Sequence, residues 1–145
     1  IITDDYPDPN FGSGAVKITG AHDFNDYAVA RRAGIPCYRL MDTRAALRTD
    51  GAPYAVAAAA AERLREGAAF TEAEVDAINL VPDDYRGLDR FEARKRVVEA
   101  ITAEGLAVTV HDAEGNHVPF VEAKKIMQPF GDRSKTVIEP MLTDQ

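Results

Sequence analysis

The residues best suited to chemistry are five polar side chains between positions 17 and 26. They are Lys17, Thr19, His22, Asp23 and Asp26. Residues 15–19 alternate apolar and polar side chains, which predicts a short strand with Lys17 and Thr19 on its polar face. Asp23 and Asp26 are three residues apart and would lie on one side of the first turn of the helix that follows. A strand followed by a helix can therefore bring these side chains to one small pocket.

Such a pocket could bind and polarise a small ligand. A carboxylate binds a cationic group such as an α-ammonium, and a threonine hydroxyl both donates and accepts hydrogen bonds. A lysine neutralises the charge of a phosphate or of a developing oxyanion. The same residues also have a structural interpretation, in which Asp23 caps the helix, Asp26 interacts with its dipole and Lys17 is solvated. Spacing alone leaves both interpretations open.

Two other functions start from different features. His22 and Asp23 could ligate a divalent ion, as in a metal-dependent phosphohydrolase. Such a site needs more ligands, and the remaining histidines, His111 and His117, flank a predicted hairpin loop, so we predict no metal site. The third possibility is a non-catalytic protein-interaction module that uses a predicted helix over residues 90–104.

The length and composition of the chain are typical of one globular domain, which would span residues 1–145. The chain has a formal net charge of -7, and 46% of its residues are apolar, which is enough for a single core. The lone Cys37 excludes a disulfide framework and suits a reducing cytoplasm, and its apolar context predicts a buried thiol. The net negative charge argues against broad electrostatic binding of a nucleic-acid duplex, but it does not exclude binding of one short RNA end.

Periodicity and turn signals predict an α+β chain with a mixed or antiparallel sheet. Helices are expected over 24–33, between Pro53 and Gly67, after the capping-box sequence 71–74, and over 90–104, where Phe91, Val97, Val98 and Ile101 form an apolar stripe. Strands are expected over 15–19, 37–41, 106–111, 117–121 and 136–139. Residues 112–116 would close a β-hairpin.

Residues 11–27 read Phe-Gly-Ser-Gly-Ala-Val-Lys-Ile-Thr-Gly-Ala-His-Asp-Phe-Asn-Asp-Tyr. This run resembles the editing-domain signature of class I aminoacyl-tRNA synthetases, and within that class it resembles the valyl enzymes. Segments 87–95 and 131–145 are similar to further parts of the same family. The resemblance implies the C-terminal portion of the β-barrel-centred editing (CP1) domain, an α+β fragment with short strands, a β-hairpin and several flanking helices.

The activity implied by this resemblance is post-transfer editing, the hydrolysis of threonine from mischarged valine tRNA. Threonine is nearly isosteric with valine, and an apolar pocket rejects an added hydroxyl only weakly. The implied partners are the 3′ end of valine tRNA carrying threonine and the rest of the parent synthetase, with no membrane and a monomeric state. ATP and Mg²⁺ would serve the parent's aminoacylating domain, and no cofactor is expected in this segment.

The family's residue roles can be carried over by position. Asp26 resembles the carboxylate that holds the substrate α-ammonium. Lys17, Thr19 and Asp23 resemble the polar wall that reads the threonine hydroxyl and places the water, and these four form the predicted catalytic set. The predicted substrate-binding set is Phe11, beside the terminal adenosine, with Gly12, Ser13, Gly14 and His22.

The chain also departs from the family pattern. Gly20 and Ser13 stand where the family usually has Pro and Thr. A Thr-Thr-Arg-Pro segment that supplies the other wall of the editing pocket is not in this sequence, nor are the His-Ile-Gly-His and Lys-Met-Ser-Lys-Ser signatures of the aminoacylating domain. The expectation is therefore a partial editing domain with half of the hydrolytic pocket.

Overall fold

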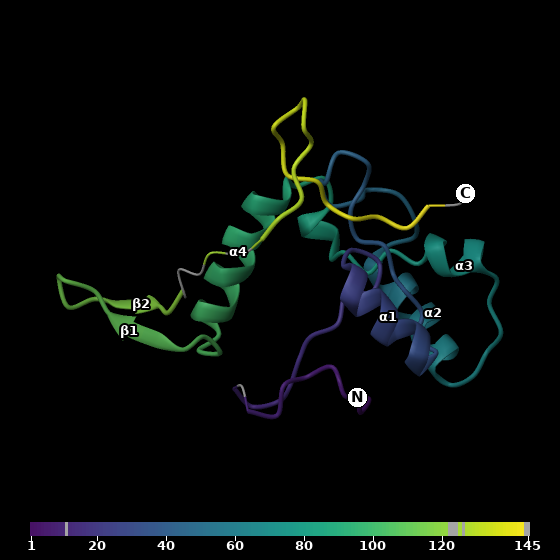
Figure 1. The fold of residues 1–145 in the computed structure, drawn as a ribbon, viewed down its shortest axis with the longest axis horizontal. Coiled ribbons are helices and arrows are strands. Elements are labelled where there is room, and N and C mark those ends of the chain that lie inside the picture. Colours follow the sequence, from purple (N-terminus) through teal and green to yellow (C-terminus); the bar gives the residue numbers. More distant parts are fainter. Residues whose placement is uncertain (11, 122–124, 126, 144–145) are drawn as a thin grey trace. The chain divides into compact units, whose positions relative to one another are not determined.

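The computed structural model describes residues 1–10, 12–121, 125 and 127–143 (Figure 1). These fall into two units: unit 1 is Ile1–Gly87 with the terminal segment from Glu139, and unit 2 is Leu88–Ile138. Phe11, one of the predicted substrate-binding residues, lies outside the described residues, and the prediction of a single domain stays a prediction.

Unit 1 contains the helices α1 (Phe24–Ala33), α2 (Tyr54–Arg65) and α3 (Glu72–Ala77) and the 3-10 turn η1 (Asp83–Tyr85). The first three confirm the predicted helices. Helix α1 ends at Gly34, whose φ of 64° is the left-handed conformation that glycine adopts without a steric penalty. Helix α3 begins with the predicted capping box, in which Thr71 and Glu74 satisfy each other's backbone amides.

Two predicted strands of unit 1 are not strands in the structure. Residues 15–19 are extended without a ladder partner among the described residues, and the Thr19 amide donates to a side chain instead. Residues 37–41 contribute only one isolated antiparallel bridge, between Met41 and Leu47. Alternation makes an extended segment, but a strand also needs a neighbour for its backbone groups, and alternation does not provide one.

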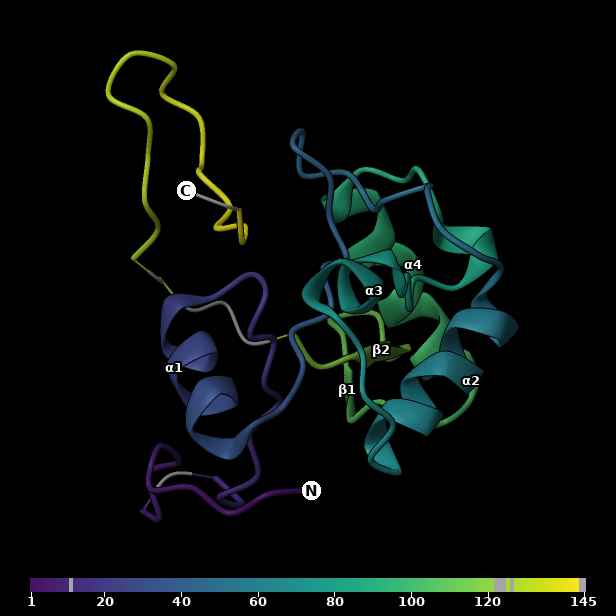
Figure 2. The same ribbon diagram turned by 90° about the vertical axis from the view of Figure 1, so that its right-hand side faces the viewer.

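Unit 2 contains helix α4 (Arg90–Ala103) and the strands β1 (Thr109–His111) and β2 (His117–Pro119). The strands pair antiparallel, with Val110 opposite Val118, and they run side by side in both views (Figure 1, Figure 2). The helix and the hairpin are confirmed, although the strands are shorter than predicted. The predicted strand 136–139 is reduced to one bridge between Phe130 and Val137.

The buried apolar residues of the described chain are concentrated in unit 1. They are Ala21, Val29, Ala30, Ala57, Ile78 and Val81 in unit 1, and Ala93 in unit 2. The predicted apolar stripe of α4 is largely exposed, because Phe91 keeps 61% and Val97 45% of their accessible surface. The α+β class is confirmed, and the sheet within the described residues has two strands.

No helix in the described part of the chain combines the length and the apolar character needed to cross a bilayer.

Candidate functional site

Asp26 is the buried centre of the predicted catalytic cluster. Its side chain projects from the first turn of α1, and the residue is 6% exposed. The Thr19 backbone amide donates to Asp26 Oδ2 at 2.7 Å, and the Thr19 hydroxyl donates to the same oxygen at 3.2 Å. Lys17 Nζ in turn donates to the Thr19 hydroxyl. The structure thus brings Lys17, Thr19 and Asp26 together in one chain of hydrogen bonds.

Asp23 has a different local role. Its Oδ1 accepts from the backbone amides of Asn25, at 2.8 Å, and Asp26, at 2.9 Å. The predicted N-cap is therefore confirmed, and it satisfies amides that the helix itself leaves unpaired. Because the cap fixes the first turn of α1, Asp23 also positions Asp26.

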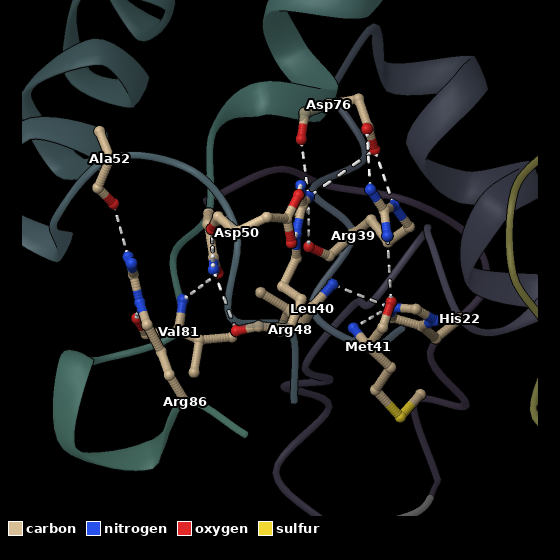
Figure 3. Close-up of polar contacts among 11 residues, drawn as sticks. His22, Arg39, Leu40, Met41, Arg48, Asp50, Ala52, Asp76, Val81 and Arg86 are labelled. Carbon is tan, nitrogen blue, oxygen red and sulfur yellow. Dashed lines mark hydrogen bonds and ion pairs between the residues drawn. The ribbon is translucent and has the colours of Figure 1, made fainter. Parts of the chain in front are cut away.

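His22 uses both ring nitrogens in backbone hydrogen bonds. Nε2 accepts from the amides of Leu40, at 2.9 Å, and Met41, at 3.2 Å (Figure 3). Nδ1 lies 2.9 Å from the Pro140 carbonyl oxygen, so it must be the protonated donor of a neutral ring. Burial lowers the pKa of His22, which also favours the neutral form.

In the hypothesis of a metal bound by His22 and Asp23, the His22 ring offers no free nitrogen, because both ring nitrogens bind backbone groups. In the part of the chain that the structure describes, no group of three or more His, Cys, Asp or Glu side chains is placed to hold a metal ion.

Gly12, Ser13 and Gly14 form an exposed turn before the extended segment. Gly12 and Gly14 have φ values of 61° and 73°, which other residues adopt with strain. A β-carbon at either glycine would meet no atom within 4 Å, so the turn is open to a ligand on that side. The Ser13 hydroxyl accepts from the Ala15 amide at 3.3 Å.

A buried polar network in unit 1 was not predicted from the sequence. The Arg48 side chain is 1% exposed, and its Nε donates to Asp50 Oδ1 at 2.8 Å (Figure 3). Its Nη1 donates to the carbonyl oxygens of Arg39, at 3.2 Å, and Asp76, at 2.6 Å. The hydrogen bond from Arg48 holds the pKa of Asp50 down at about 2.

Asn79 and Arg39 extend this network. Asn79 is fully buried, and its amide nitrogen donates to the carbonyls of Arg48, at 3.2 Å, and Asp50, at 2.8 Å. Arg39 forms a two-point ion pair with Asp76, at 2.8 and 2.9 Å. The network therefore fixes residues 39–41, in which the amides of Leu40 and Met41 bind His22, and it connects them to α3.

The whole chain is similar to part of two known valine–tRNA ligases. It is 68% identical to the valine–tRNA ligase of Ruegeria pomeroyi over 160 aligned residues and 41% identical to that of Rhizorhabdus wittichii over 145. Both alignments cover the whole chain but only 16% and 12% of the relatives. No family model matches the chain. No solved structure matches it.

The class of protein is therefore that of the aminoacyl-tRNA synthetases. Within this class, the chain belongs to the valine–tRNA ligase family, as a segment that spans less than a fifth of the length of these two relatives.

Proposed function

We propose that this segment forms part of the pocket in which a valine–tRNA ligase hydrolyses threonine from mischarged valine tRNA. The observation that carries the proposal is the hydrogen-bonded chain of Lys17, Thr19 and Asp26, which ends on a nearly buried carboxylate. Two hydrogen bonds from Thr19 to one oxygen fix the carboxylate, and a fixed group needs no reorganisation when substrate binds.

Each side chain then has a defined task. Asp26 Oδ1 binds the substrate α-ammonium, while Oδ2 is held by Thr19. Lys17 and the Thr19 hydroxyl read the threonine hydroxyl and place the attacking water. The exposed carboxylate of Asp23 lies on the same side of α1 and completes the polar wall, with its Oδ1 anchoring the helix.

Selectivity follows from the polarity of this wall. A substrate hydroxyl gives the polar side chains a partner, whereas a valine methyl group in the same position would leave them unpaired. A site built for a hydroxyl therefore rejects the correct amino acid, which protects properly charged tRNA from hydrolysis. The glycine turn at Gly12 and Gly14, with Ser13, Phe11 and His22, would receive the terminal adenosine.

The rest of the ligase would complete the pocket. The extended segment 15–19 has no strand neighbour in the described residues, which supports a place in a larger β-barrel whose other strands come from elsewhere in the parent. ATP and Mg²⁺ would be used by the parent's aminoacylating domain, in the cytoplasm, where valine tRNA is charged.

The test is an Asp26→Ala substitution in the complete ligase that contains this segment. We expect deacylation of threonyl-tRNA to slow by about a hundredfold or more, with valine attachment unchanged. Glu62→Gln on α2 is the control, because Glu62 is exposed and forms an ion pair with Arg65 in its own helix. Unchanged deacylation in Asp26→Ala would refute the assignment of this carboxylate.

Binding can be tested on the chain directly. A non-hydrolysable threonyl-adenosine analogue should shift the amide resonances of Lys17, Thr19 and Asp26 more than the valyl analogue does. Equal shifts with both analogues would contradict a pocket that reads the hydroxyl.

A further inference from the structure

The hairpin of unit 2 places two histidines face to face. His111 on β1 is the register partner of His117 on β2. Their ring centroids are 4.1 Å apart, and the ring planes are tilted by 55°. Both residues are exposed, in contrast to His22, whose ring nitrogens bind backbone groups.

The hydrogen-bond pattern explains why the rings are so close. Outside the two strands, the Asp112 amide donates to the Asn116 carbonyl at 3.0 Å, and the Phe120 amide donates to the Val108 carbonyl at 2.8 Å. Hydrogen-bonded and non-hydrogen-bonded pairs alternate along an antiparallel ladder, so the histidines form a non-hydrogen-bonded pair. Side chains approach each other most closely at such pairs.

Nearby polar groups determine which atoms can act as ligands. His117 Nδ1 lies 3.5 Å from the Thr109 hydroxyl, a long hydrogen bond that leaves Nε2 on the opposite side of the ring. Asp112 is already used in the turn, because its Oδ1 accepts from the amides of Glu114, at 3.0 Å, and Asn116, at 2.8 Å. At the paired strand positions 111 and 117, the ligands are therefore the two imidazoles.

We propose that His111 and His117 form a two-imidazole binding site for a divalent transition-metal ion of the zinc type. Imidazole nitrogen is a preferred ligand of zinc, copper and nickel, at about 2.0–2.1 Å for zinc, so two ligand nitrogens must come within about 3.3 Å of each other. Two exposed rings with centroids 4.1 Å apart reach this geometry by side-chain rotation. Water completes the coordination.

Metal binding would fasten β1 to β2. An isolated two-stranded hairpin is only marginally stable, and an ion that binds the paired form alone shifts the equilibrium toward it. The site uses none of the residues proposed for editing.

The experiment is a zinc chloride titration of the chain at pH 7.5, followed by calorimetry and by the imidazole nitrogen resonances. We expect one ion per chain, with His111 and His117 shifting together and His22 unchanged. His111→Ala and His117→Ala should each weaken binding by about a hundredfold, because a single imidazole loses the chelate. Wild-type affinity in either single variant, or shifts at His22, would overturn the proposal.

Two further measurements separate ligand loss from hairpin loss. Thr109→Val keeps a β-branched shape and both imidazoles, so it should retain binding within about tenfold. Cross-strand proton contacts between Val110 and Val118 report whether the hairpin stays paired in each variant. If His117→Ala keeps these contacts and still binds zinc as the wild type does, the two-imidazole site is refuted.

Discussion

The two units of this chain achieve order in different ways. Unit 1 buries apolar side chains together with Arg48 and Asn79, and their polar atoms satisfy backbone groups from distant segments. In unit 2, the buried apolar residue among those described is Ala93, and its order comes from one helix and one hairpin. Long-range polar contacts can thus fix irregular segments, whereas local structure needs few buried side chains.

This difference determines how far a substitution should propagate. Arg48 joins residues 39, 50 and 76, which are separated along the chain by loops and helices. Glu92 and Arg96 of α4, in contrast, form an ion pair within their own helix, at 3.0 Å. Damage to the network should disturb all of unit 1, and damage to the surface of α4 should remain local.

Arg48→Met should have the largest effect. The substitution leaves the carbonyls of Arg39 and Asp76 without their buried donor, which we expect to cost about 3 kcal/mol of unfolding free energy. The matched control in unit 2 is Arg96→Met, which removes an exposed pair worth about 0.5 kcal/mol or less. Urea unfolding of both variants measures the contrast, and equal losses would contradict it.

The limits of sequence analysis follow the same division. The helices were predictable because caps and periodicity are local: Asp23 and Gly34 bound α1 as expected. The polar network around Arg48 was not predictable, because Arg48 and Asp76 are 28 residues apart in the sequence. In addition, the sequence does not show which charged residues are buried. For the candidate site, spacing suggested that Lys17, Thr19 and Asp26 converge, but the predicted strand has no ladder partner among the residues that the structure describes.

Gly20→Ala should have the next largest effect, and it tests how tightly unit 1 is packed. A β-carbon at Gly20 would lie 2.8 Å from both the Ala30 β-carbon and Cys37 Sγ, so neighbours must move. We expect a loss of about 2 kcal/mol, measured by thermal or urea unfolding. The contacts also explain why glycine, rather than a residue with a β-carbon, suits a chain with Cys37.

The double variant Gly20→Ala with Cys37→Ala is the control for this packing argument. Removing Sγ eliminates one of the two close contacts, so the double variant should lose less stability than the sum of the single variants. Additive losses would mean that Gly20 is required for a reason other than the contact with Cys37.

The smallest expected effect is a pH dependence confined to unit 1. Burial lowers the pKa of His22 below the ordinary imidazole value of 6.5, so just below pH 6.5 the unfolded chain binds more protons than the folded one. Neutral His22 therefore makes its full contribution to the unfolding free energy above pH 6.5, and this contribution is lost as the pH falls below that value. Because one proton is involved, the unfolding free energy can change by at most about 1.4 kcal/mol per pH unit.

Denaturant unfolding between pH 7.5 and 5, read from amide signals of α1, measures this slope. His22→Gln removes the titrating ring. The variant should be less stable than the wild type at pH 7.5, and its unfolding free energy should change less between pH 7.5 and 5. His111→Ala with His117→Ala is the control in unit 2, because both rings are exposed there, and it should leave the slope of unit 1 intact. If that control abolishes the slope and His22→Gln preserves it, the pH sensitivity belongs to the hairpin rather than to the buried ring.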